Sequence, residues 1–423
     1  MEKTFALRGD ICYSKARDCI ECIEDSWLVC EQGINQGVFK QLPDKYQGVK
    51  VYDYRRHIIT PGLVDLHVHA PQYSFRALNM DMELIEWLNT NTFPEEAKYV
   101  DLEYAKRAYE LFVRDLSIGA TTRAAVFATL HVESTEILMD LLEESGIRAV
   151  VGKVNMDRNS PDNLREASAG RSEADTRRWL ESVLGKYQHV APILTPRFIP
   201  SCTDELMARL ANVQREYHLP VQSHLSENPG EIRWVEELCP DTNCYGEAYD
   251  KYGLFGGDCP TIMAHCVYPS QMEIALMKER GVFIAHCPQS NTNLSSGIAP
   301  IRTYLDNHMP VGLGSDVAGG FMTSIFRAMA DAIQVSKLRW RLVDDGLKPL
   351  TVDEAFYLGT KGGGAFFGKV GSFEKGYEFD ALVLDDSNLS HPQQLSVKQR
   401  LERLIYLSDD RNIIGKFIFG KKI

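Results

Sequence analysis

Two histidines stand one residue apart in the segment GLVDLHVHAPQY, residues 62–73. The apolar residues before them predict a buried strand, in which side chains two positions apart point to the same face. His67 and His69 are therefore expected to project together. A single buried histidine is usually a hydrogen-bonded core residue, whereas two on one face each need a polar partner, and imidazole is a common metal ligand.

Other residues of similar chemistry stand at the ends of later apolar runs. His224 and Glu227 lie in SHLSE, His265 in MAHC, His286 in AHCPQSN and Asp316 in GLGSD. Five of the chain's 11 histidines, with one Asp and one Glu, thus stand at predicted strand ends. Three imidazoles and a carboxylate that leave room for water suit a catalytic zinc or ferrous ion, so we predict a metal site.

The middle of the chain alternates between strand patterns and amphipathic helical patterns. The apolar runs are residues 62–70, 120–127, 148–156, 191–198, 220–227, 261–266, 282–288 and 311–316. Eight such runs, each followed by a helix, predict a parallel sheet covered on its outside, and eight is the number that closes a (β/α)8 barrel. In a barrel of this kind the chemistry lies at the carboxyl ends of the strands, where the predicted site residues stand.

Two helices of this region have recognisable starting signals. Ser270 with Glu273, and Thr351 with Glu354, have the spacing of a capping box. In that motif the first residue's side chain and the fourth residue's side chain each bind the other's backbone N–H group. The spacing therefore predicts helices that begin at these positions.

The two ends of the chain resemble each other and differ from the middle. Residues 1 to about 60 contain short strand patterns broken by Gly and Asp, and the same short-strand pattern returns after about residue 370. We therefore expect residues 1–60 and 370–423 to pair into one composite small β domain beside a barrel of residues 61–369.

The net charge argues against some classes of binding partner. Acidic side chains outnumber basic ones by 58 to 46, which gives a formal charge of −12 and argues against nucleic acid and anionic membrane surfaces. The first residues, MEKTFALRGD, lack the apolar core of a signal peptide, and the ten cysteines are scattered. We expect a cytoplasmic protein with reduced thiols that binds neither nucleic acid nor membranes.

The whole pattern resembles the amidohydrolase superfamily, whose members carry HxH on the first strand, His on the fifth and sixth, and Asp on the eighth. Several segments are similar in order and spacing to the guanine deaminase family: PGLVDLHVHAPQYSF, LIEWLNTNTFPEE, ILTPRF, QSHLSEN, HCPQSN, GLGSDVAGG and YLSDDRNI. The resemblance implies an α/β fold, a (β/α)8 TIM-like barrel with a small β-sandwich domain formed by the N- and C-terminal segments. It also implies a homodimer.

The resemblance implies a role for each candidate residue. One zinc ion per chain, or ferrous iron in its place, is held by three histidines and one aspartate: His67, His69, His224 and Asp316. Glu227 is the proton shuttle, His265 orients the metal-activated hydroxide, and Asp316 takes a proton from that water while remaining at the metal. Because four ligands are then supplied, we expect His286 not to be a ligand but either to support the ligands from behind or to be a structural residue of its strand.

Gln72, Arg197 and Phe198 are the residues that the resemblance places against a purine substrate. Guanidinium and carboxamide donors suit the O6 acceptor of guanine, and Phe198 suits stacking on the ring, although an aromatic residue of the wall would read the same in sequence. The implied reaction is hydrolytic deamination of guanine to xanthine and ammonia. Hydroxide attacks C2 while Glu227 delivers a proton to ring N3 and later to the departing amine.

Three alternatives stay open at this point. One is another one-metal aminohydrolase that acts on cytosine, an oxidised purine or a triazine. Another is a catalytically silent barrel that serves as a binding protein. The third is a two-metal amidase, against which the run 191–198 argues because it contains no lysine to bridge two metals, and Lys153 lies one strand too early.

Overall fold

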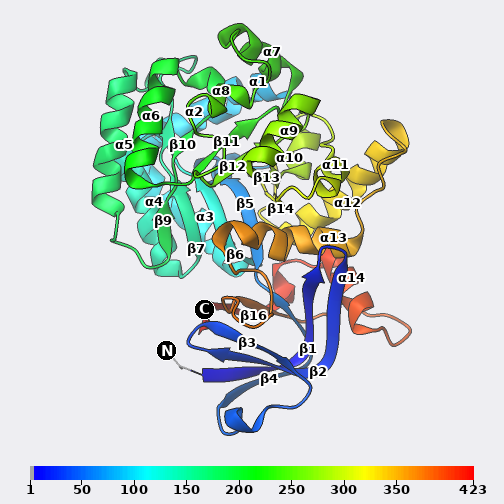
Figure 1. The fold of residues 1–423 in the computed structure, drawn as a ribbon. Coiled ribbons are helices and arrows are strands. Elements are labelled where there is room, and N and C mark those ends of the chain that lie inside the picture. The colour runs from blue at the N-terminus through cyan, green and yellow to red at the C-terminus, as the bar shows by residue number, and fades with distance from the viewer. Residues whose placement is uncertain (1–3) are drawn as a thin grey trace.

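The computed structural model describes residues 4–423, so the first three residues of the predicted terminal segment 1–60 lie outside it. Figure 1 shows strands β5–β14 inside a layer of helices, with β1–β4 and β16 gathered below them. Within the described part of the chain, no helix combines the length and the apolar character needed to cross a membrane.

Each of the eight predicted apolar runs contains a strand. The strands are β5 (Leu63–His69), β6 (Thr121–Phe127), β7 (Arg148–Gly152), β8 (Val154–Asn155), β9 (Val190–Pro192), β10 (Thr195–Pro196), β11 (Val221–Leu225), β12 (Thr261–His265), β13 (Phe283–His286) and β14 (Val311–Leu313). The third and fourth runs are each divided into two strands. In the fourth run Pro192 and Pro196 have no N–H group to donate to a ladder, which accounts for its short strands.

The strands form parallel sheets with the orders β5-β6-β7-β9 and β11-β12-β13-β14, and β8 pairs with β10. Backbone hydrogen bonds link the outer edges of the two larger sheets. Leu194 donates its N–H to Pro220 O at 2.9 Å, beside β11. At the other edge Asp316, after β14, donates its N–H to His67 O of β5 at 2.8 Å.

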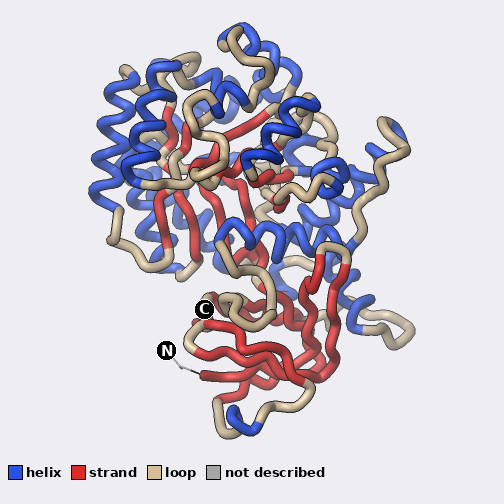
Figure 2. Tube along the Cα trace, in the orientation of Figure 1, coloured by secondary structure: helices blue, strands red, loops and turns tan. Residues whose placement is uncertain are grey.

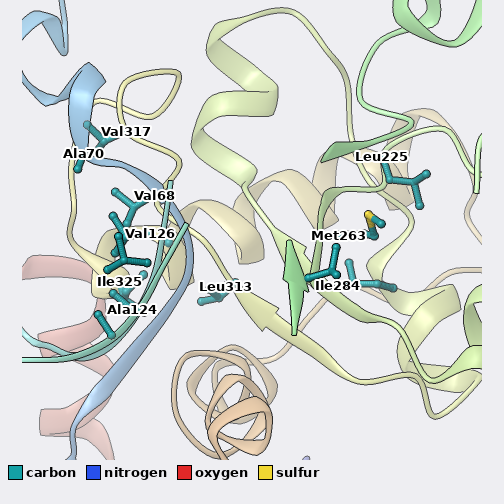
Figure 3. Close-up of a cluster of buried hydrophobic side chains, with 14 of the residues drawn as sticks. Val68, Ala70, Ala124, Val126, Leu225, Met263, Ile284, Leu313, Val317 and Ile325 are labelled. Atoms are coloured by element: carbon teal, nitrogen blue, oxygen red, sulfur yellow. The ribbon is translucent and has the colours of Figure 1, made fainter. Parts of the chain in front are cut away.

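These strands are buried on both faces. Val68, Val126 and Met263 belong to the large cluster that also contains Ile325 of a covering helix (Figure 3). Other residues of these strands pack in a separate cluster: Val64, Leu66, Ala125, Ile262, Ala264 and Ala285. Burial on both faces explains why the runs are continuously apolar in sequence rather than alternating.

Helices cover the outside of the strands (Figure 2). They are α1 (Leu84–Trp87), α2 (Phe93–Glu96), α3 (Leu102–Ile118), α4 (Val132–Ser145), α5 (Ala169–Val183), α6 (Asp204–Tyr217), α7 (Pro229–Leu238), α8 (Glu247–Asp250), α9 (Gln271–Arg280), α10 (Pro288–Asn293), α11 (Ile301–Asp306), α12 (Ile325–Leu342), α13 (Val352–Tyr357) and α14 (Val397–Leu407). Helix α14 lies within the C-terminal segment, for which we had predicted only strands.

The two predicted helix starts are correct, but only one has the full capping box. At α13 the side chains of Thr351 and Glu354 bind each other's backbone N–H groups. At α9 Ser270 accepts from the backbone of Glu273, but the Glu273 carboxylate instead accepts from Ser226 Oγ at 2.7 Å and from a backbone N–H of the neighbouring loop. A buried hydroxyl close by thus draws the carboxylate away from the helix start.

A seven-stranded sheet joins the two ends of the chain in the order β17-β16-β15-β4-β1-β2-β3. Its strands are β1 (Thr4–Ala16), β2 (Cys19–Glu31), β3 (Ile34–Phe39), β4 (Lys50–Pro61), β15 (Ala381–Leu384), β16 (Ile413–Ile418) and β17 (Lys421–Lys422). The prediction of short strands near the N-terminus is wrong, since β1 and β2 have 13 residues each. Irregular pairing between Gly9 and Ile11 accommodates the Gly-Asp break inside one continuous strand.

Candidate active site

Four side chains predicted as ligands converge at the carboxyl ends of their strands. His67 and His69 come from β5, His224 from β11, and Asp316 follows β14. The Nε2 atom of His69 lies 3.2 Å from that of His67 and 3.2 Å from that of His224. Asp316 Oδ1 lies 3.1 Å from His67 Nε2 and 3.4 Å from His69 Nε2. The structure thus places His67 and His69 on the same face of β5, as predicted.

These spacings fit one metal ion. Ligands held tetrahedrally about 2.0–2.1 Å from zinc stand about 3.3 Å from one another. His224 Nδ1 contacts Arg197 O at 2.6 Å, which leaves Nε2 free as a ligand. Burial lowers the pKa of all three histidines, so the imidazoles are neutral, which is the form that binds metals.

Asp65, a residue that the sequence did not single out, ties two ligand-bearing segments together. Its carboxylate accepts from the backbone N–H of His67 at 3.1 Å, and from the N–H and Oγ–H groups of Ser315 at 3.0 and 2.5 Å. Burial raises the pKa of Asp65 to about 7. The pairing of β5 with β6 is irregular between Asp65 and Val68, and such irregularities redirect side chains next to active sites.

His265 stands between two carboxylates. Its Nε2 atom lies 3.4 Å from Glu227 Oε2 and 3.7 Å from Asp316 Oδ2, and its Nδ1 atom lies 2.9 Å from Asn291 Oδ1. An amide oxygen can only accept, so Asn291 fixes a proton on Nδ1 and aims Nε2 at the carboxylates. Burial raises the pKa of Asp316, but the contacts with His67 and His265 outweigh it, so the pKa is lowered and the carboxylate is ionised.

Glu227 is buried beside the ligands without belonging to their cluster. Burial raises its pKa to about 7, with Glu231 and Asp316 acting in the same direction and His265 opposing them. Its Oε1 atom accepts from Ser296 Oγ at 3.1 Å. A carboxyl group that titrates near neutral pH next to such a cluster suits proton transfer.

One cavity opens onto these groups. Its polar lining includes Gln72, Arg197 and Glu227, and Phe198 and several other apolar side chains complete the wall. The further apolar residues are Leu84, Trp87, Leu88 and Leu294. The structure therefore brings the predicted substrate residues to the same cavity as His69, His224, His265 and Asp316.

Phe198 forms part of the wall and has an aromatic neighbour of its own. Its ring lies 6.2 Å from that of Trp234 in an edge-to-face arrangement. Gln72 lies on a short 3-10 helix, Ala70–Phe75, directly after β5, and Arg197 directly follows β10. The side chains of Gln72 and Arg197 meet at Glu96, to which both donate hydrogen bonds.

Neither His286 nor Lys153 lines this cavity. His286 is buried, and neither of its ring nitrogens has a partner among residues 4–423. Lys153 is buried and pairs with Glu166 at 2.5 Å, so its ammonium is already engaged in an ion pair.

Glu96, Asn291 and Ser296 were not predicted. Each acts on a residue far away in sequence, as Glu96 does on Arg197 at a separation of 101 residues. The segment with Glu96 carries no spacing signal, because Glu95 beside it has the same side chain and points to different partners.

Comparison with known proteins agrees with this arrangement. A sequence model described as Amidohydrolase family matches residues 58–423. A guanine deaminase of Dictyostelium discoideum is 38% identical over 97% of this chain and 90% of its own length. A guanine deaminase of Mus musculus is 40% identical over 86% of this chain and 82% of its own length.

A solved structure extends the similarity to the fold. The crystal structure of guanine deaminase from C. acetobutylicum with bound guanine in the active site has a TM-score of 0.97 and 49% identity to this chain. The match covers 99% of this chain and 100% of the other. With its convergent ligands, its family match and these relatives, the chain belongs to the amidohydrolase family.

Proposed function

We propose that this protein hydrolyses guanine to xanthine and ammonia. The observation that carries the proposal is a single buried cavity that combines convergent metal-type ligands, a carboxyl group titrating near pH 7, and amide and guanidinium donors. The guanine deaminases described above support guanine as the substrate over cytosine, triazines or a silent barrel.

The ligand set fits one zinc ion per chain, with ferrous iron as the alternative, held by His67, His69, His224 and Asp316. When bound, such a metal supplies Lewis-acid chemistry and lowers the pKa of water toward about 7. All three imidazoles have lowered pKa values and Asp316 is ionised, so no proton has to leave the cluster before an ion enters.

The residues around the cavity then have separate roles in the reaction. Asp316 Oδ1 faces the histidine ligands, while Oδ2 faces His265 and accepts a proton from the attacking water. The Nε2 atom of His265, aimed by Asn291, orients that water toward C2 of the purine. Glu227 gives its proton to ring N3. It then takes the proton of the new hydroxyl at C2 and gives it to the amino group, which leaves as ammonia. The proton held by Asp316 restores Glu227 for the next cycle.

Gln72, Arg197 and Phe198 hold the ring. The amide of Gln72 and the guanidinium of Arg197 offer donors to the O6 acceptor, which adenine lacks. Phe198 supplies an apolar surface for the ring at the wall. Closing the purine between these groups also keeps bulk water away from the reacting carbon.

We also propose the larger organisation predicted from the sequence. Residues 61–369 form a (β/α)8 barrel, supported by the backbone hydrogen bonds at both junctions of the parallel sheets. Residues 1–60 and 370–423 form a small β-sandwich domain, supported by the sheet to which both ends contribute. The protein acts as a homodimer in the cytoplasm, and sedimentation at micromolar concentration tests the dimer.

A substrate panel tests the activity. Metal-replete protein is given guanine, adenine, cytosine and dihydroorotate, and both ammonia release and the ultraviolet spectrum are followed. We expect turnover of guanine to xanthine and no comparable turnover of the others. Activity on another base with none on guanine would contradict the assignment of Gln72 and Arg197, and no activity at all would support a binding protein.

A further inference from the structure

A buried carboxylate, Glu96, joins the two side chains proposed to read the purine. We propose that Glu96 is a positioning residue that sets the pocket's selectivity for a purine with an oxygen at C6. The inference rests on the proposed function, because it concerns how Gln72 and Arg197 recognise the base. Glu96 itself does not line the cavity, so it acts through these two residues.

Glu96 is placed to bind both groups at once. It is the last residue of α2, and its side chain is 2% exposed. Gln72 Nε2 donates to Glu96 Oε1 at 2.9 Å, and Arg197 Nη1 donates to Glu96 Oε2 at 2.5 Å. Each carboxylate oxygen therefore fixes one of the two candidate purine contacts.

The contact with Glu96 determines which way the Gln72 amide points. Gln72 Oε1 accepts the backbone N–H of Ala318 at 3.2 Å, while Nε2 donates to Glu96. A flipped amide would set an oxygen against the carboxylate and an NH2 group against an N–H donor, so only one orientation satisfies both neighbours. The second N–H of Nε2 then remains as a donor for a ligand.

The guanidinium of Arg197 is fixed in the same way. Phe93, three residues before Glu96 on α2, places its ring centroid 5.4 Å from the guanidinium carbon. Glu96 compensates the buried positive charge, which would otherwise be costly. Among the residues that the structure describes, the guanidinium makes no other hydrogen bond, so its remaining N–H groups are available on the cavity side.

Together, Gln72 and Arg197 present hydrogen-bond donors to the purine and no acceptor that can rotate toward it. Such an arrangement favours a carbonyl at C6 and rejects a hydrogen atom or an amino group there. Without the Glu96 carboxylate, the Gln72 amide could rotate and present its oxygen, and the Arg197 charge would lack its partner. Selectivity for the C6 substituent would then fall while chemistry at C2 stayed in place.

Glu95 provides a matched control on the same helix. It is also buried, but its carboxylate accepts from Ser74 Oγ at 2.5 Å and from Lys98 Nζ at 2.6 Å, away from Gln72 and Arg197. Glu95→Gln therefore removes a buried negative charge from α2 without touching the proposed purine contacts. Any loss that it shares with Glu96→Gln reflects stability alone.

The experiment compares the two variants with wild type on two substrates. Guanine and 2-aminopurine share the C2 amino group, but only guanine has an oxygen at C6. We expect Glu96→Gln to lower the ratio of kcat/KM for guanine over 2-aminopurine by roughly 10- to 100-fold, the range for hydrogen bonds to charged groups. Glu95→Gln should leave the ratio unchanged. Inhibition by hypoxanthine relative to unsubstituted purine should weaken in parallel in Glu96→Gln.

An equal loss on both substrates, with an unchanged ratio, would show that Glu96 is merely structural and would overturn the inference. If wild type turned over neither substrate, the proposed function would fail instead, so the two failures are distinguishable. Should Glu96→Gln not fold, Glu96→Asp, which keeps the charge but draws the carboxylate back by one methylene, decides on the same ratio.

Discussion

Replacing Glu227 with glutamine separates proton transfer from every other property of the site. Gln has the same shape and its amide oxygen can still accept from Ser296 Oγ, which lies 3.1 Å from the present carboxylate. It cannot carry a proton between water and substrate. Neither of the other acids in the cavity wall can substitute. Asp316 lies against the histidine ligands, and Tyr245 and the backbone N–H of Glu227 occupy the two oxygens of Glu231.

Because no second acid is free to take over, we expect the loss in kcat to lie in the upper part of the range for a general acid, about 10³- to 10⁴-fold. That loss corresponds to about 4–5.5 kcal/mol of transition-state stabilisation. The assay is steady-state guanine hydrolysis at saturating substrate, with metal content measured on the same sample. Metal content should be unchanged, since Glu227 lies outside the candidate ligand cluster.

Two results would refute this reasoning. A kcat within about tenfold of wild type would show that Glu227 does not move the proton. Loss of metal together with activity would show that the carboxylate is a ligand. Glu237→Gln, an exposed change on helix α7, which begins two residues after Glu227, serves as the control and should leave both quantities unchanged.

Three further predictions concern selectivity and stability. Arg197→Ala should raise KM for guanine at least about tenfold and reduce the preference of the enzyme for guanine over adenine. Unchanged kinetics would show that Arg197 is structural. Burial raises the pKa of Glu273 from 4.5 to about 7, so the folded protein holds this proton more tightly than the unfolded chain, and the resulting stability is lost as pH rises through 7. The unfolding free energy of wild type relative to Glu273→Gln should therefore fall by about 2–3 kcal/mol between pH 5 and pH 8, and a flat difference would contradict the buried carboxyl. Gly152→Ala would place a Cβ 1.7 Å from Thr195 Oγ1 and should cost about 1–3 kcal/mol in a urea titration, whereas Gly170→Ala, with no atom closer than 3.9 Å, should cost nothing.

The sequence predicted those features that depend on local periodicity. The spacing of His67 and His69 predicted a shared face, and the eight apolar runs predicted the parallel strands, because a strand buried on both faces is continuously apolar. The ends of those runs also located His224, His265 and Asp316. Each of these inferences needed only a strand pattern and the rule that parallel strands end at a common edge.

Contacts between distant segments could not be predicted in this way. Nothing near Glu96 indicates that it binds Arg197, since the partner lies on another element and Glu95 offers the same chemistry. Asn291 orients His265 across 26 residues for the same reason. Helix α14 was also missed, because the strand patterns around it were taken to describe the whole C-terminal segment.

The most direct test of the central claim is a metal titration of metal-free protein with zinc, followed by guanine hydrolysis and ammonia release. One ion held by His67, His69, His224 and Asp316 predicts that activity rises in proportion to added zinc and reaches its maximum at about one equivalent per chain. A maximum at about two equivalents would support a two-metal site, and activity that does not depend on metal would contradict the account.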